Sequence, residues 1–282
     1  MSQQWQELRA RNIGGSEIAA LFGKSPWTTE FKLWHEKHGL IVADEISNER
    51  ADAGKFLEPA IIAWANHKWG LDLFTAGIYV EHAEIKGMGC TPDAFSVGDS
   101  RLMAQIKNVD SLQFSLKWET EGETVTKAPL DILLQVQHEM EVCDKDRSYL
   151  IVCVGGNRLY FMLCERDRRT GYIIKRTVDN FWNIKEPPNP DFQRDYETIR
   201  TLRQNLPVTD YEDLSEDADL HRTLRRAQKL RKEIKKREDE YGAIKAEILY
   251  AAKQYEGFTC KNFTVKFNKN GTLNLNDKEI RA

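Results

Sequence analysis

The spacing of hydrophobic residues along this chain changes several times, and each change predicts a different element. In the N-terminal part, apolar residues recur at helical spacing in GGSEIAALF (14–22), where Ser16 is a candidate N-cap, and in TTEFKLWHEKHG, which ends at Gly39. A third helix is predicted near 50–69. One face of that helix is expected to carry Phe56, Leu57, Ile61, Trp64 and Ala65.

The middle of the chain alternates between strand and helix patterns. Short strands are predicted around 72–81, 85–96 and 101–107, followed by a buried helix in ILLQVQHEMEVC (132–143). Two further strands are predicted in YLIVCVGG and RLYFMLCERD. This order of helices and mixed strands predicts an α/β or α+β core without internal repeats.

The C-terminal part has a different character. Three prolines in EPPNPDF (186–192) interrupt regular structure and suggest one domain over residues 1–190 and an extension over 191–282. In the extension, a long helix has apolar residues every seven positions, which suits a seam packed on a partner helix or on the core. The tail FTVKFNKNGTLNL predicts a β-hairpin turning at Asn270-Gly271.

Composition narrows the class of protein. With 282 residues, of which 41% are hydrophobic, the chain has enough apolar surface for one sizeable core and an appendage. We expect no membrane span and, because the N-terminus lacks a signal peptide's apolar core, a cytoplasmic protein. The five cysteines form no CxxC pair, which favours reduced thiols over a zinc site.

Net charge does not decide the function. A formal charge of −3 does not indicate a nucleic-acid-binding protein, yet cations can gather locally while the rest of the surface stays acidic. Residues 222–237 hold nine lysines and arginines against one acid. That run either contacts a DNA backbone or forms a solvated helix face.

The strongest chemical signal lies in TPDAFSVGDSRLMAQIKN (91–108). Asp93 is expected at a strand end, and residues 105 and 107 point to one face of the next strand because side chains alternate. A carboxylate beside an oxygen ligand and a lysine suits metal-assisted phosphodiester hydrolysis, since Mg²⁺ prefers oxygen ligands. A strand of this kind on a solvated hairpin is the ordinary alternative.

Four sequence blocks favour the metal-dependent site over the solvated hairpin. WQELRARNIGGSEIAALFG, GKFLEPAIIAW, TPDAFSVGDSRLMAQIK and LLQVQHEMEVC occur in the order and spacing of the YqaJ-like phage recombinase exonucleases. The chain resembles this family, which is related to lambda exonuclease within the PD-(D/E)XK nuclease superfamily, over roughly residues 5–165. The resemblance implies a restriction-endonuclease-like α/β core with a mixed central sheet flanked by helices.

The resemblance also implies the roles of the site residues. Asp93 would be the central metal ligand, with Gln105 and the backbone carbonyl of Ile106 beside it. Lys107 would orient the attacking water and the phosphate. Glu58 would hold metal-bound water, and on sequence alone it is equally a surface charge. The cofactor implied is Mg²⁺, for which Mn²⁺ would substitute.

A second group of residues is implied to bind the 5′-phosphate of DNA. It consists of Arg9, Ser16, Thr91 and Gln137. An arginine and hydroxyl groups are good phosphate ligands. Ser16 could instead be a helix cap, and Gln137 could bond within the core, while Gln135 is expected to point elsewhere on its helix.

Gln105 departs from the family pattern, in which glutamate is usual. An amide oxygen can bind Mg²⁺ but brings no charge. The sequence therefore leaves three hypotheses. The favoured one is a Mg²⁺-dependent exonuclease that resects the 5′-ended strand of linear duplex DNA, passes the 3′ overhang to an annealing protein and assembles as a homo-oligomer, a trimer by resemblance. The others are a structure-specific or restriction-like endonuclease and a catalytically silent DNA-binding protein.

Overall fold

A computed structural model describes residues 3–43, 49–207, 211–252, 255–268 and 273–277. The chain forms two compact units, Met1–Pro207 and Val208–Ala282. The boundary expected near residue 190 precedes α8, which belongs to the first unit because the Asp195 carboxylate accepts a 2.5 Å hydrogen bond from the Thr29 hydroxyl.

The first unit mixes helices and strands in the order that the sequence suggested. Its helices are α1 (Gln3–Ala10), α2 (Ile18–Leu21), α3 (Glu30–Lys37), α4 (Glu49–Trp69), α5 (Ser111–Lys117), α6 (Leu130–Val142), α7 (Arg168–Asn183) and α8 (Tyr196–Asn205). Its strands are β1 (Leu73–Thr75), β2 (Val80–Glu81), β3 (Gly89–Cys90), β4 (Ala94–Ser96), β5 (Leu102–Val109), β6 (Glu119–Glu121), β7 (Thr124–Lys127), β8 (Arg147–Val154) and β9 (Arg158–Glu165).

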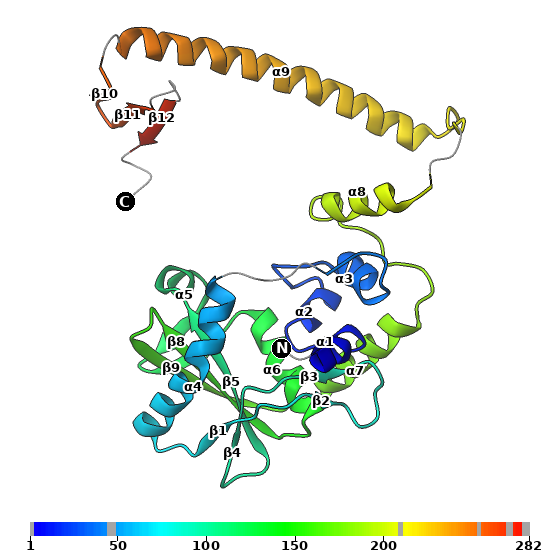
Figure 1. The fold of residues 1–282 in the computed structure, drawn as a ribbon, viewed down its shortest axis with the longest axis vertical. Coiled ribbons are helices and arrows are strands. Elements are labelled where there is room, and N and C mark those ends of the chain that lie inside the picture. The colour runs from blue at the N-terminus through cyan, green and yellow to red at the C-terminus, as the bar shows by residue number, and fades with distance from the viewer. Residues whose placement is uncertain (1–2, 44–48, 208–210, 253–254, 269–272, 278–282) are drawn as a thin grey trace. The chain divides into compact units, whose positions relative to one another are not determined.

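A mixed sheet forms the centre of this unit (Figure 1). Its strand order is β1-β4-β5-β8-β9-β7-β6. The central strands β5 and β8 run parallel, and β4 pairs antiparallel with β5. β8 is a nearly continuous apolar run because both of its faces are covered. The mixed sheet flanked by helices confirms the predicted fold class.

Helices α4 and α6 cover opposite faces of the sheet. Ala104 and Ile106 of β5 pack with Ile61 and Ala65 of α4. Met103, on the other face of the same strand, packs with residues of α6. A third cluster joins α2, α3, α6 and α7 around Phe181. Because side chains alternate on β5, Gln105 and Lys107 share the face that α6 covers.

Several features of the first unit differ from the sequence interpretation. Helix α7 and the β6–β7 hairpin were not predicted. The expected apolar face of α4 is only partly buried, because Ile61 is 4% exposed whereas Phe56 is 84% exposed. Ser16 does not cap α2: Glu17 occupies the N-cap position, no side-chain cap bond forms, and the helix has four residues.

The second unit contains one long helix and a small sheet. Helix α9 spans Ala218–Ala252, and the antiparallel strands are β10 (Gly257–Cys260), β11 (Phe263–Phe267) and β12 (Leu273–Asp277). The predicted helix and the pairing of the last two strands are confirmed, whereas β10 was not predicted. The predicted turn at Asn270-Gly271 lies outside the described residues. In the part of the chain that is described, no helix has the length and apolarity needed to cross a membrane.

Candidate active site

The register of β4 and β5 brings the central carboxylate to its predicted neighbour. Ala94 pairs with Ala104, so continuing the antiparallel register by one residue places Asp93 opposite Gln105. The Gln105 amide donates to Asp93 Oδ2 at 2.5 Å, and the Ile106 backbone N–H donates to the same oxygen at 2.7 Å. Asp93 Oδ1 carries no hydrogen bond among the described residues. The strand pair therefore fixes one carboxylate oxygen and leaves the other for a ligand.

Lys107 is held by helix α6. Its ammonium donates to Gln135 Oε1 at 2.9 Å, and the Gln135 amide donates to Glu139 Oε1 at 2.8 Å. This chain of bonds joins β5 to a buried carboxyl on α6 and fixes the position of the lysine. Sequence reasoning missed Glu139 altogether and expected Gln135 to point away from the site.

Glu58 on α4 is electrostatically coupled to the same cluster. Partial burial, followed by the negative charge of Asp93, raises the pKa of Glu58 to about 7, and Lys107 opposes the shift. Burial also raises the pKa of Asp93, against the opposing effects of Lys107, the Ile106 N–H and Gln105. Burial and then Asp93 raise the pKa of Glu139. Three carboxyl groups and one lysine thus interact here.

The oxygen atoms of this cluster fit a hard divalent cation. Gln105 Oε1 and Glu139 Oε2 are buried without a hydrogen-bond partner among the described residues. Buried polar atoms are rarely left without a partner, and an ion or water commonly explains the exceptions. Asp93 adds a carboxylate oxygen to this set, and such oxygens are ligands that Mg²⁺ accepts. Within the described ranges, however, His, Cys, Asp and Glu side chains form no group of three or more placed to hold a metal ion.

A small pocket collects three of the four residues expected at the DNA phosphate. A cavity of about 150 Å³ is lined by Arg9, Ser16 and Thr91, together with Gln135 and Glu139 of α6. Its polar lining connects the phosphate candidates directly to the bonded chain that ends at Lys107. The structure therefore brings the two predicted groups of site residues to one place.

Gln137 lies elsewhere, contrary to the sequence interpretation. Its amide donates to the Glu165 carbonyl at 2.8 Å, and its oxygen accepts from the Asp167 N–H at 2.9 Å. Residues 135 and 137 are two positions apart on a helix, which rotates their side chains by about 200°. Gln135 therefore occupies the position expected for Gln137, and Gln137 braces the turn before α7.

Lys37 holds the N-terminal wall of the pocket. Its ammonium donates to the backbone carbonyls of Arg9 at 2.6 Å and Asn12 at 2.8 Å, and pairs with Glu17 at 2.8 Å. The Glu17 carboxylate also accepts from the Gly14 N–H. One buried lysine of α3 thus fixes both the end of α1 and the turn that carries Ser16. Nothing in its sequence context marked it as a site residue.

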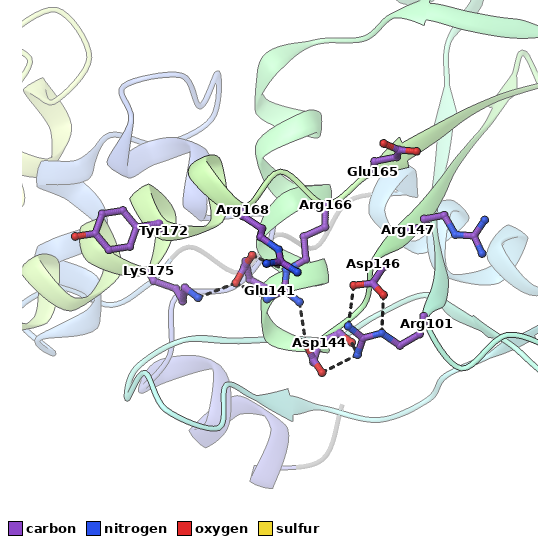
Figure 2. Close-up of a pocket in the computed structure, with 10 residues that line it drawn as sticks. All are labelled: Arg101, Glu141, Asp144, Asp146, Arg147, Glu165, Arg166, Arg168, Tyr172 and Lys175. Carbon is purple, nitrogen blue, oxygen red and sulfur yellow. Dashed lines mark hydrogen bonds and ion pairs between the residues drawn. The ribbon is translucent and has the colours of Figure 1, made fainter.

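A larger cavity, of about 710 Å³, belongs to a different kind of cluster (Figure 2). Arg166 bonds both oxygens of Glu141, at 2.6 and 2.7 Å, and also pairs with Asp144. Arg101 joins Asp144 to Asp146. These pairs tie the α6–β8 turn to the start of β5 and to the segment before α7. Because these charges are paired with one another, the residues that line this cavity stabilise the fold and do not form the candidate active site.

Comparisons with known proteins identify the family and the fold. Residues 4–146, just over half of the chain, match the model of the YqaJ-like viral recombinase domain. The protein YqaJ of Bacillus subtilis strain 168, described as uncharacterized, is 28% identical over 185 residues. That alignment covers 64% of this chain and 56% of the length of YqaJ.

Solved structures support the fold. The alkaline exonuclease LHK-Exo from Laribacter hongkongensis has a TM-score of 0.52 and 18% identity, with 73% of this chain and all of that chain covered. LHK-Exo in complex with dAMP gives the same TM-score and coverage at 19% identity. The resemblance stated from the four sequence blocks is confirmed, and the chain belongs to the YqaJ-like viral recombinase domain family.

Proposed function

We propose that this protein is a Mg²⁺-dependent deoxyribonuclease that resects the 5′-ended strand of linear duplex DNA and leaves a 3′ overhang. Family membership and a fold shared with an exonuclease that binds dAMP support a nuclease role. One observation carries the proposal. Asp93, Gln105 and Lys107 meet on adjacent strands, and a polar pocket lined by Arg9 opens beside them.

The proposed chemistry follows from the site residues. Asp93, the Gln105 amide oxygen and the Ile106 carbonyl would hold Mg²⁺, with Glu58 bonded through water. A bound Mg²⁺ would neutralise phosphate charge and lower the pKa of water. Lys107, fixed by Gln135, would place a positive charge beside the scissile phosphate, where negative charge grows in the transition state. Mn²⁺ would replace Mg²⁺ because both accept oxygen ligands.

Digestion of matched linear and circular duplexes tests the proposal. The wild type should degrade only the linear form, with Mg²⁺ and not with EDTA, and strand-specific end labels should report loss of the 5′-ended strand. The Asp93→Asn variant, purified identically, serves as the control for contaminating nuclease. Cleavage of the circle would favour the endonuclease hypothesis. Duplex binding without any cleavage would favour the silent DNA-binding hypothesis.

The pocket beside the site gives a sharper test. Arg9, Ser16, Thr91 and Gln135 are proposed to bind a terminal 5′-phosphate, so dephosphorylated ends should be digested more slowly than phosphorylated ends. Gln135→Ala should remove most of that difference. Gln137→Ala is its matched control, because it removes the same side chain from the same helix outside the pocket. Equal effects of the two variants would contradict the assignment.

The product suggests the partners. A 3′ overhang is a substrate for a single-strand annealing protein, and co-purification with such a protein encoded nearby would test that pairing. We also propose a homo-oligomer, a trimer by resemblance to the exonucleases. Light scattering on the full chain would measure it, and a monomer that digests DNA processively would contradict it.

A further inference from the structure

Helix α9 carries nine lysines and arginines over residues 222–237 that the nuclease site does not explain, and five of them share one face of the helix. We define the basic stripe as Arg222, Arg225, Lys229, Lys232 and Lys236. Their spacing of three and four residues places them along one face of an α-helix. All five are exposed. From Arg222 to Lys236 the stripe extends over fourteen residue steps, or about 21 Å at the rise of an α-helix.

The charges of the stripe are poorly balanced. Arg222 pairs with Asp219, and Arg225 contacts His221. Lys229, Lys232 and Lys236 have no ion pair among the described residues. Like charges three and four residues apart repel one another on a helix, and Glu233, a neighbour of Lys229 and Lys236, is the one acid among residues 222–237. A polyanion bound along the stripe would relieve this repulsion.

The stripe lies opposite an apolar row of the same helix. Ala227, Ile234 and Tyr241 repeat every seven residues, with Leu230 and Ile244 beside them. In a helix of 3.6 residues per turn, this row and the stripe are separated by roughly half a turn. A partner that covered the apolar row would therefore leave the stripe exposed.

We propose that the basic stripe binds the phosphate backbone of duplex DNA as a sequence-independent contact outside the nuclease unit. This inference rests on the proposed function for its choice of DNA as the polyanion. Duplex DNA carries a charge about every 1.7 Å, so about 21 Å of duplex offers roughly twelve phosphates to five cations. Lysine and arginine side chains that contact only phosphates bind DNA by charge, independently of its sequence, and their affinity falls steeply as the salt concentration rises.

A binding experiment isolates the stripe from the active site. The full chain with Asp93→Asn is titrated onto a fluorescent duplex whose ends are both closed by loops, so that no terminal phosphate contributes. The test variant adds Lys229→Gln, Lys232→Gln and Lys236→Gln. The control adds Lys245→Gln, Lys261→Gln and Lys266→Gln, which remove the same charge from the same unit. Circular dichroism checks that α9 stays helical in both.

The expected result is a loss of affinity of about tenfold or more for the test variant. Its slope of log affinity against log salt should also fall by about 2 to 3, since three phosphate contacts are lost. The control should bind within about twofold of the parent. Equal affinity of test variant and parent would overturn the inference, and so would equal losses in test and control. Binding to anionic vesicles without binding to DNA would also overturn it.

The outcome is separable from the proposed function. If the wild type fails to digest linear duplex but binding to the closed duplex depends on the three lysines, the nuclease proposal fails and the stripe stands. If digestion proceeds and the lysine variant binds like its parent, the stripe fails alone.

Discussion

Glu139 and Glu141 are two buried carboxyl groups on α6, two residues apart, with opposite surroundings. Glu139 accepts one hydrogen bond from Gln135, and its second oxygen has no partner among the described residues. Glu141 is bonded by Arg166 through both oxygens and by Lys175 at 3.0 Å. Burial raises the pKa of both, but only at Glu141 do the cations outweigh it and lower the pKa overall.

The difference separates a charge that is neutralised within the fold from a carboxyl group at the candidate site. A buried carboxylate with two cations stabilises the fold only while both partners remain. Several carboxyl groups that share a single lysine repel one another when they are ionised, and a bound metal cation can relieve that repulsion. Such perturbed clusters gather at functional sites. The ion pairs around Glu141 in the larger cavity therefore stabilise the fold, and the smaller pocket, which Glu139 lines, is the candidate site.

The largest effects are expected from removing one cation near each carboxyl group, Lys107 near Glu139 and Arg166 beside Glu141. Lys107→Ala should reduce cleavage by about 10³-fold, since a positioned charge of this kind contributes about 4 kcal/mol to the transition state, while stability changes little. Arg166→Ala should cost about 3 kcal/mol of unfolding free energy, because Glu141 loses its bidentate partner. Denaturant unfolding and cleavage per folded molecule measure both. Loss of cleavage in well-folded Arg166→Ala would remove the distinction.

Neutralising each carboxylate should sharpen the same contrast. Glu141→Gln should destabilise the protein by about 2 kcal/mol, because charge-assisted hydrogen bonds to Arg166 and Lys175 are weakened. Glu139→Gln should change stability by less than about 0.5 kcal/mol, because Glu139 has no ion pair among the described residues and its bond from the Gln135 amide can also be made to an amide oxygen. Matched urea titrations at neutral pH measure both. Similar losses of stability in the two variants would show that Glu139 also pairs with a cationic side chain.

Gln105→Glu should make the site more dependent on metal. The substitution removes the N–H donor to Asp93 and adds a second negative charge, so stability in EDTA should fall by about 1–2 kcal/mol. Mg²⁺ should then raise the melting temperature more than it does for wild type, and the half-saturating concentration for cleavage should fall. Unchanged melting in EDTA would mean that Gln105 does not determine the charge balance of the site.

The last prediction concerns the stability of the protein in acid. The folded-state pKa of Glu141 lies below its ordinary value of 4.5. Its contribution to stability is therefore complete above pH 4.5 and is lost as the pH falls through the folded-state value. Wild type and Glu141→Gln should consequently differ at neutral pH and converge as the pH is lowered below 4.5. A constant difference across that range would exclude titration of Glu141 as its source.

The sequence predicted the strand chemistry better than the helix chemistry. Alternation on β5 was enough to place Gln105 and Lys107 on one face, and the hairpin brought Asp93 opposite. On α6, by contrast, the apolar pattern indicated burial on more than one side, so the pattern did not reveal whether Gln135 or Gln137 faces the site. Only contacts with Lys107 and with the turn before α7 decide that.

Other differences have equally local causes. Phe56 stands five residues before Ile61, a rotation of about 140° on a helix, so it lies off the face that Ile61 and Ala65 bury against the sheet. The acid Glu139 carries no sequence signal, because its role depends on Gln135 and on the distant Lys107. Helix α7 could have been found, since Ile174, Val178 and Phe181 are spaced for one buried face.

Each of the two carboxyl groups is pressed against a glycine, Gly15 beside Glu139 and Gly171 beside Glu141, with no room for a methyl group at either position. Alanine at 171 would push Glu141 off its arginine, and alanine at 15 would push Glu139 off Gln135. In a saturation library sorted first by cellular abundance and then by DNA cleavage, these two similar steric constraints should therefore behave differently. Position 171 would be depleted in the first sort, and position 15 would survive it and disappear only in the second.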